Sequence, residues 1–184
     1  MTSETQRITE PEEIQRILLE RAAELARSPD EEIDGGEVIS LVVVALGPER
    51  YGLDIDRVRE IKPCEDLTPM PATPPFWLGL VNLRGHLYPV LDLARYLGHR
   101  VDGADANATA QTVLIVGNGM TIGLRVDEVP EVRTVRVAEI GPSLVEASAD
   151  RPHVHAGLTA DLLSIIDIDA LLADPALVVQ DEMD

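Results

Sequence analysis

Apolar residues recur along the chain with two different periods, one near its start and another over the remainder. From residue 11 to residue 27 they follow helical spacing, at Ile14, Ile17, Leu18, Ala22 and Leu25. Thr9 and Glu12 have the spacing of a capping box, and Pro29 disfavours helical geometry at the residue before it. The pattern predicts an amphipathic helix and a polar linker, which together occupy residues 1–36.

From residue 38 onward the apolar residues form short runs or alternate with polar ones, as strands do. Residues 38–46 are an apolar, β-branched run, and residues 51–55 alternate after a turn. Residues 113–116 and 121–126 repeat this arrangement around Asn118-Gly119, a pair that accepts the positive φ angles of a tight hairpin turn. We expect a β-hairpin in each place.

The two expected hairpins resemble each other, and the resemblance continues beyond them. At an offset of 71 residues the matching pairs are Gly52/Gly123, Leu53/Leu124, Ile55/Val126, Asp56/Asp127, Val58/Val129, Glu60/Glu131 and Ile61/Val132. At an offset of 75 they are Leu91/Ile166, Asp92/Asp167, Leu93/Ile168 and Leu97/Leu172, and Gly79 matches Gly157 at an offset of 78. An internal duplication is the simplest explanation of this repeated order.

Each repeat is long enough for about five short strands, which is the content of a small closed barrel. The sequence therefore predicts a mainly all-β fold with a domain over residues 37–175, followed by an acidic tail over residues 176–184. We expect one barrel over about 38–108 and the other over about 109–174. An exchange of terminal strands between the two halves stays open.

The chain is strongly acidic throughout, with 33 acids against 15 Lys and Arg and a formal charge of −18. Such a field repels phosphate backbones and anionic lipids, so nucleic acid and direct membrane insertion are disfavoured. Cys64 is the only cysteine, which excludes an internal disulfide. No apolar run of 18 residues and no signal-like start is present, and we expect a cytoplasmic protein.

Two segments, residues 67–71 and 79–93, resemble the signature of the CheW family of chemotaxis coupling proteins. The residues that fit this signature are Val58, Glu60, Ile61, Thr68, Pro71, Gly79, Asn82, Leu83, Arg84, Gly85, Pro89, Val90, Asp92 and Leu93. A weaker form of the pattern runs from Gly123 to Val132 and continues through Gly157 to Leu172. The resemblance covers about residues 38–174.

The resemblance implies two SH3-like five-stranded barrels and a non-catalytic adaptor without a cofactor. It implies two partners, the regulatory domain of a CheA-type histidine kinase and the cytoplasmic tip of a chemoreceptor, and recruitment to membrane receptor arrays. The residues expected to bind these proteins are Val58, Glu60, Ile61, Gly79, Leu83, Arg84, Gly85, Val129 and Val132.

Each of these residues also has a structural alternative that the sequence leaves open. Val58 and Ile61 are apolar residues at a strand end, where a receptor helix or the protein core could bury them. Arg84 is a typical interface anchor, but its guanidinium could instead hold its own loop. Gly79 and Gly85 flank a turn and could serve only its conformation.

Two other interpretations of the function remain. The first is that the same fold serves a type IV pilus or another chemosensory pathway. The second is a small metal-dependent enzyme, because His153 and His155 alternate on an expected strand and their rings should then point the same way. A zinc site needs a third protein ligand and usually a fourth, and His86 and His99 lack ligand spacing. The role of the N-terminal helix is open.

Overall fold

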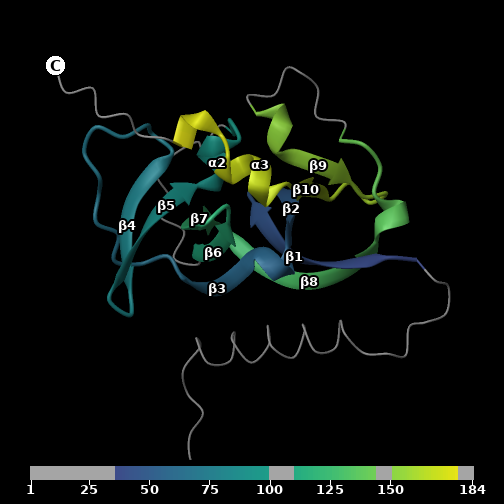
Figure 1. Cartoon of the computed structure of the whole chain (residues 1–184), viewed down its shortest axis with the longest axis horizontal. Coiled ribbons are helices and arrows are strands. Elements are labelled where there is room, and N and C mark those ends of the chain that lie inside the picture. The colour runs from purple at the N-terminus through teal and green to yellow at the C-terminus, as the bar shows by residue number, and fades with distance from the viewer. Residues whose placement is uncertain (1–35, 100–109, 144–150, 178–184) are drawn as a thin grey trace, which may run out of the picture.

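The computed structural model describes residues 36–99, 110–143 and 151–177, which form ten strands in two five-stranded sheets (Figure 1). The expected N-terminal helix and most of the acidic tail lie outside these residues. The strands are β1 (Val38–Leu46), β2 (Glu49–Asp54), β3 (Val58–Pro63), β4 (Trp77–Leu83), β5 (His86–Asp92), β6 (Gln111–Gly117), β7 (Met120–Val126), β8 (Glu128–Arg136), β9 (His155–Leu158) and β10 (Ser164–Ile166).

Short helices occupy some of the connections. Two are α-helical, α2 (Leu93–Tyr96) and α3 (Ile168–Leu172), and four are single 3-10 turns, η2 (Ile55–Arg57), η3 (Val137–Glu139), η4 (Pro152–Val154) and η5 (Pro175–Leu177). Asp92 and Asp167 cap α2 and α3 in the same way, because each carboxylate accepts the backbone N–H three residues later. In the described part of the chain, no helix is long and apolar enough to cross a membrane.

The two sheets have the same strand order. One runs β3-β6-β7-β5-β4 and is called the first barrel here; the other runs β8-β1-β2-β10-β9 and is called the second barrel. In each barrel, the segment that follows the strand at one edge (β3 or β8) pairs with the strand at the opposite edge (β4 or β9) and so closes the sheet. Thr68 pairs with Leu80 of β4 in the first barrel, and Gly141 pairs with Leu158 of β9 in the second. The predicted two-barrel, mainly β fold is therefore confirmed, and the shared strand order is the one that an internal duplication predicts.

The expected division of the chain near residue 108 is wrong, because the barrels exchange their hairpins. The β1–β2 hairpin belongs with β8, β9 and β10, whereas the β6–β7 hairpin belongs with β3, β4 and β5. Each barrel is completed by a parallel pairing between distant segments, β2 with β10 and β7 with β5. The sequence repeats are thus not the structural units, and neither half of the chain contains a whole barrel.

One hydrophobic cluster joins the two barrels. It contains fully buried side chains of β1 and β2 from the second barrel, and of β5, β6 and β7 from the first, together with α2 and α3. Side chains alternate across a strand, so β1 places Val42 and Val44 in this shared core, while Leu41 and Val43 fill the second barrel itself. The barrels therefore form one packed body.

Candidate protein-binding surface

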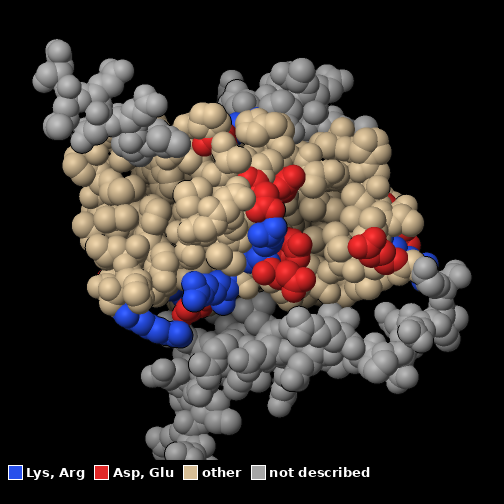
Figure 2. Space-filling model, viewed as in Figure 1, with Lys and Arg blue, Asp and Glu red and all other residues tan. Residues whose placement is uncertain are grey.

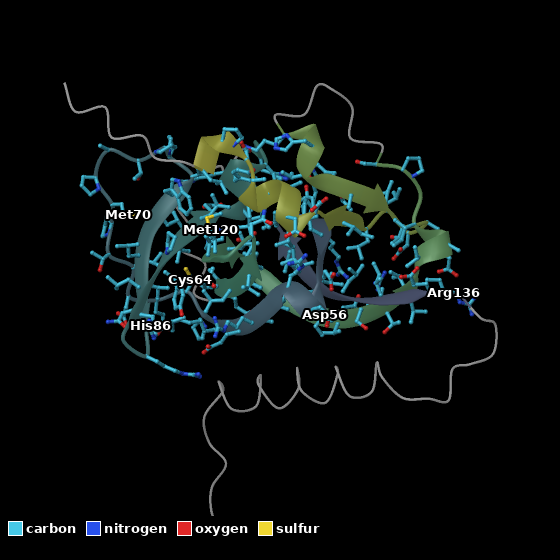
Figure 3. The ribbon with its side chains drawn as sticks, in the orientation of Figure 1. Asp56, Cys64, Met70, His86, Met120 and Arg136 are labelled. Carbon is cyan, nitrogen blue, oxygen red and sulfur yellow. The ribbon has the colours of Figure 1, made fainter. Side chains whose placement is uncertain are left out.

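The shared core reaches the surface between β3 and β8. Four half-buried apolar side chains pack on its margin there and are called the seam: Ile55, Val58, Val129 and Val132. β3 and β8 occupy equivalent edge positions in their sheets and run along the lower side of the molecule in Figure 1. The η2 turn, which carries Asp56 (Figure 3), contacts β1 of one barrel and β6 of the other.

Strand pairing explains why the seam residues face the shared core. Val58 lies opposite Ile115 and Val132 lies opposite Val42, both of which are fully buried in the shared cluster. The pairing of β3 shifts by one residue between Val58 and Glu60, as a β-bulge does. Three of the residues expected to bind a partner, Val58, Val129 and Val132, are thus brought to the margin of one cluster.

Arg84 and Gly85 form the two-residue turn between β4 and β5. Both residues have positive φ, 50° and 84°, and the Gly85 N–H donates to Asn82 Oδ1 at 3.1 Å. The Arg84 side chain is 76% exposed, and its Nη2 lies 3.6 Å from Glu60 Oε1 on β3. The alternative in which Arg84 holds its own loop has no support in its contacts, since its described partner is a side chain on another strand.

The turn between β6 and β7 shows what is unusual about Arg84. Asn118 and Gly119 occupy it with φ angles of 49° and 74°, nearly those of Arg84 and Gly85. Asparagine is common in this left-handed region because its short amide bonds locally, whereas arginine gains nothing comparable. Arg84 therefore holds a conformation that costs it on the order of 1 kcal/mol. Ala72 and Leu162 also have positive φ, 56° and 67°, so the backbone strain marks Arg84 together with its exposure and its contact with β3.

Two of the expected binding residues serve the fold instead. Ile61 is only 8% exposed and belongs to the shared core, so it offers no surface to a partner. Gly79 is buried with φ of +147°, and a Cβ there would lie 2.3 Å from the Thr68 carbonyl oxygen. The corresponding Gly157 has the same task, because its Cβ would meet Gly141 at 2.8 Å. At both positions the absence of a side chain leaves room for the backbone segment that closes the barrel. Leu83, in contrast, stays half-buried beside the Arg84 turn.

Charged side chains cross the middle of this face (Figure 2). Arg57 of η2 pairs with Asp169 of α3, and the Asp169 carbonyl oxygen accepts from Asn118 Nδ2 at 3.1 Å. α3 follows a strand of the second barrel, whereas Asn118 belongs to the first. These polar contacts therefore fix the two barrels relative to each other beside the seam.

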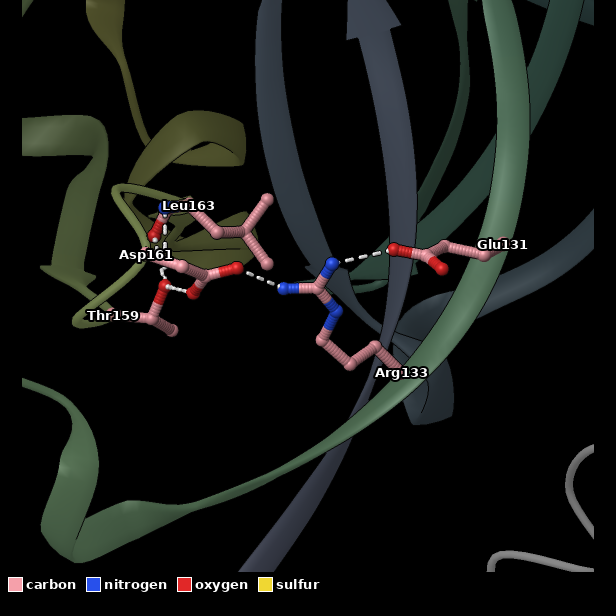
Figure 4. Close-up of polar contacts among 5 residues, drawn as sticks. All are labelled: Glu131, Arg133, Thr159, Asp161 and Leu163. Atoms are coloured by element: carbon pink, nitrogen blue, oxygen red, sulfur yellow. Dashed lines mark hydrogen bonds and ion pairs between the residues drawn. The ribbon is translucent and has the colours of Figure 1, made fainter.

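A polar network joins β8 to the connection between β9 and β10 (Figure 4). Arg133 bridges Asp161 in the β9–β10 connection and Glu131 on its own strand, 2.6 Å away. Thr159 donates to Asp161 Oδ1 at 2.6 Å and accepts from the Leu163 N–H at 3.0 Å. The Thr159 hydroxyl, followed by Arg133, lowers the pKa of Asp161. The sequence analysis missed this network, because its partners are 28 residues apart and follow no motif.

The two histidines proposed as metal ligands have separate environments. His153 lies in η4 rather than on a strand, and its Nε2 is 3.4 Å from Asp174. His155 begins β9, and its Nδ1 is 2.8 Å from Ser164 Oγ. The expectation that both rings point the same way from one strand is wrong. Within residues 36–99, 110–143 and 151–177, no group of three or more His, Cys, Asp or Glu side chains is arranged to hold a metal ion.

Comparisons with known proteins agree with this arrangement. The crystal structure of the scaffolding protein TtCheW from Thermoanaerobacter tengcongensis is similar, with a TM-score of 0.67 and 30% identity over 76% of this chain and 96% of that one. A probable chemotaxis protein CheW of Rhizobium etli is 32% identical over 73% of this chain and 87% of its own. The chemotaxis protein CheW of Klebsiella aerogenes is 31% identical over 80% and 91%.

Two hairpin-exchanged five-stranded barrels around one shared core define a two-barrel β scaffold. The sequence model of the CheW-like domain matches residues 40–176. The chain belongs to the CheW-like domain family.

Proposed function

We propose that this protein is a non-catalytic coupling scaffold of a chemosensory assembly, which joins a chemoreceptor tip to the regulatory domain of a CheA-type histidine kinase. Support comes from its relatives, which are named chemotaxis proteins and, in one solved structure, a scaffolding protein. The acidity of the chain favours recruitment through a receptor rather than through anionic lipid. The protein then works in the cytoplasm, at the membrane-bound array.

The observation that carries this proposal is the strained, exposed Arg84, which lies 3.6 Å from Glu60 on β3, the strand that also carries Val58 of the seam. Its guanidinium combines a fixed charge with a flat apolar face, which suits an anchor at the edge of an apolar contact. The half-buried valines of the seam provide that contact, and a receptor helix could lay its apolar face across them. Glu60, 3.6 Å from Arg84, would orient the guanidinium toward the partner.

The test is a charge reversal at Arg84 with a matched control. Arg84→Glu removes the anchor and places two acids together, so affinity for the receptor tip or the kinase regulatory domain should fall by about 1–3 kcal/mol. Arg50→Glu makes the same change at an exposed position of β2 in the other barrel. Titration calorimetry with each partner measures the effect. Equal binding by wild type and both variants, all of them folded, would contradict the role of Arg84.

A further inference from the structure

Three polar side chains join the two barrels at the end of α2, and they are called the Tyr51 cluster: Glu49, Tyr51 and His99. Glu49 and Tyr51 lie on β2 of the second barrel, whereas His99 follows α2, which continues from β5 of the first. The Tyr51 hydroxyl oxygen lies 2.7 Å from Glu49 Oε2 and 2.8 Å from His99 Nε2. His99 Nδ1 lies 3.3 Å from Glu49 Oε1, so the three contacts form a closed circuit.

A count of protons shows what this circuit requires. Each of the three contacts needs one hydrogen between its two heavy atoms. An ionised glutamate supplies none, the tyrosine hydroxyl supplies one, and a neutral imidazole supplies one. With either tautomer of a neutral His99, two acceptors therefore face each other in one of the contacts. The circuit is complete only when the cluster holds one further proton.

The further proton belongs on the imidazole of His99. Burial, followed by the hydrogen bond to Glu49, raises the pKa of Tyr51, so the phenol keeps its own hydrogen. The Glu49 side chain is 54% exposed, and a carboxylic acid in water is a far stronger acid than an imidazolium. A doubly protonated His99 donates from Nε2 to Tyr51 and from Nδ1 to Glu49, while Tyr51 donates to Glu49.

We propose that the Tyr51 cluster is a pH-sensitive contact between the barrels, which is closed while His99 is protonated and opens when this proton leaves. Tyr51 is 5% exposed and its strand is paired on both sides, so the His99 side chain is the part that moves. Histidine changes its charge between about pH 5 and 8, and the 22% exposed ring of His99 can exchange its proton with water. The proposal is independent of the binding partners.

The other titratable groups near the cluster act in the opposite direction. Burial, followed by the charge of His99, lowers the pKa of His155, whose ring centroid lies 6.2 Å from that of Tyr51; Glu49 opposes this shift and His153 adds to it. A histidine with a lowered pKa costs stability as pH falls below its unfolded value of about 6.5. His153 faces Asp174 at 3.4 Å, and Arg95 of α2 faces Asp92 at 3.6 Å. The Tyr51 cluster, in contrast, weakens as pH rises.

Glu49→Gln separates the proton from the contacts. A glutamine amide can donate to the Tyr51 oxygen and accept from His99 Nδ1, while Tyr51 donates to His99 Nε2. The variant therefore completes all three contacts with a neutral His99, and its cluster should stay closed at every pH. His86→Gln is the matched control, because His86 is an exposed histidine on β5 outside the cluster.

Amide hydrogen exchange at the end of α2 measures the opening. The Leu97 N–H donates to the Leu93 carbonyl at 3.0 Å, and the His99 N–H donates to the Ala94 carbonyl at 2.9 Å. Protection of these two amides, relative to the intrinsic exchange rate at each pH, should fall about two- to tenfold in wild type between about pH 6 and about pH 8.5. We expect the same fall in His86→Gln and a constant protection in Glu49→Gln.

The nitrogen resonances of the His99 ring provide a second measurement that needs no variant. Both ring nitrogens should carry protons at about pH 6 in wild type, where the amides are protected. A neutral His99 ring beside protected amides would overturn the proposal, as would wild-type protection that does not change with pH. A Glu49→Gln protein that follows the wild-type curve, or that is poorly protected at both pH values, would overturn it as well.

Discussion

At the scale of single residues, Arg84 allows the stability of the fold and the proposed binding to be separated by mutation. Its backbone geometry is that of Asn118 in the turn between β6 and β7, but its side chain is poorly suited to that geometry. Natural proteins accept such local cost where the side chain is used. The sequence identified Arg84 as a candidate through its family motif, but only the φ angle shows that it adopts a conformation that disfavours arginine.

Arg84→Asn should therefore stabilise the protein while weakening its interactions. Asparagine accepts the left-handed conformation, so we expect the free energy of unfolding in urea to rise by about 0.5–1 kcal/mol. Affinity for the partner that uses Arg84 should fall. Asn118→Arg, the converse change in the β6–β7 turn, should lose at least as much stability, because it also removes the hydrogen bond to the Asp169 carbonyl oxygen. A less stable Arg84→Asn protein would show that the arginine holds the fold.

A second residue-scale feature is the carboxylate of Asp174, which is 6% exposed. Burial by itself raises its pKa, but the Tyr96 hydroxyl at 2.6 Å, the Ala176 N–H at 2.8 Å and Arg151 outweigh that effect and hold the pKa below its usual value. Burial, followed by the hydrogen bond to Asp174, raises the pKa of Tyr96, whereas Arg151 acts in the opposite direction. Tyr96 ends α2 of the first barrel, whereas Asp174 follows α3 of the second, so this bond joins the two.

The pKa shift of Asp174 predicts how stability depends on pH. A carboxyl whose pKa is lower in the folded state contributes stability that is complete well above the unfolded pKa of about 4, and that disappears as pH falls through the folded pKa. Asp174→Asn should cost about 2–3 kcal/mol at pH 7, and the difference from wild type should shrink below about pH 4. Urea unfolding at several pH values measures this. A difference that is constant from pH 7 to pH 2.5 would contradict the assignment.

At the scale of elements, the local parts of the fold were predictable and the distant pairings were not. The Asn118-Gly119 hairpin was predicted correctly, because a two-residue turn depends on its own residues. The barrel boundary was predicted wrongly, because β2 pairs with β10 more than 100 residues away, and nothing in either strand specifies that partner. Ile61 was expected to bind a partner, because the sequence pattern marks an apolar residue at a strand end without showing whether the protein core or another protein buries it.

The closure of each barrel depends on a glycine, and this gives an element-scale prediction. Gly79→Ala would drive a Cβ into the backbone of the segment that pairs with β4. Together with the positive φ, we expect this to cost about 2–4 kcal/mol of unfolding free energy. Gly141→Ala is the control, because its Cβ would stay 3.7 Å from the nearest atom, in ordinary contact. Equal stability of the two variants in urea would show that the closing segment moves freely.

At the scale of the whole molecule, the exchanged hairpins and the shared core predict a single cooperative unfolding unit. Leu53 of β2 belongs to the second barrel but is fully buried in the cluster that joins both. Leu53→Ala should remove about 3 kcal/mol of stability. Trp77, the only tryptophan, lies on β4 of the first barrel and reports on that barrel by fluorescence.

We expect the fluorescence transition of Trp77 and the far-UV circular dichroism transition to move together to lower urea in Leu53→Ala, since neither barrel can lose its core alone. A Trp77 transition that stays at the wild-type midpoint, while circular dichroism shows a second step, would mean that the barrels unfold separately. The seam would then lie between two independent bodies, and its geometry would not be fixed by the fold.

Physical coupling of two other proteins is the central claim, and co-sedimentation tests it most directly. Receptor-tip fragments assembled on beads are mixed with a CheA-type kinase regulatory domain, with and without this protein. We predict that the kinase domain is recovered with the beads in the presence of the protein, and that recovery falls with Arg84→Glu but not with Arg50→Glu. Recovery of the kinase domain at the same level with and without the folded protein would contradict the account.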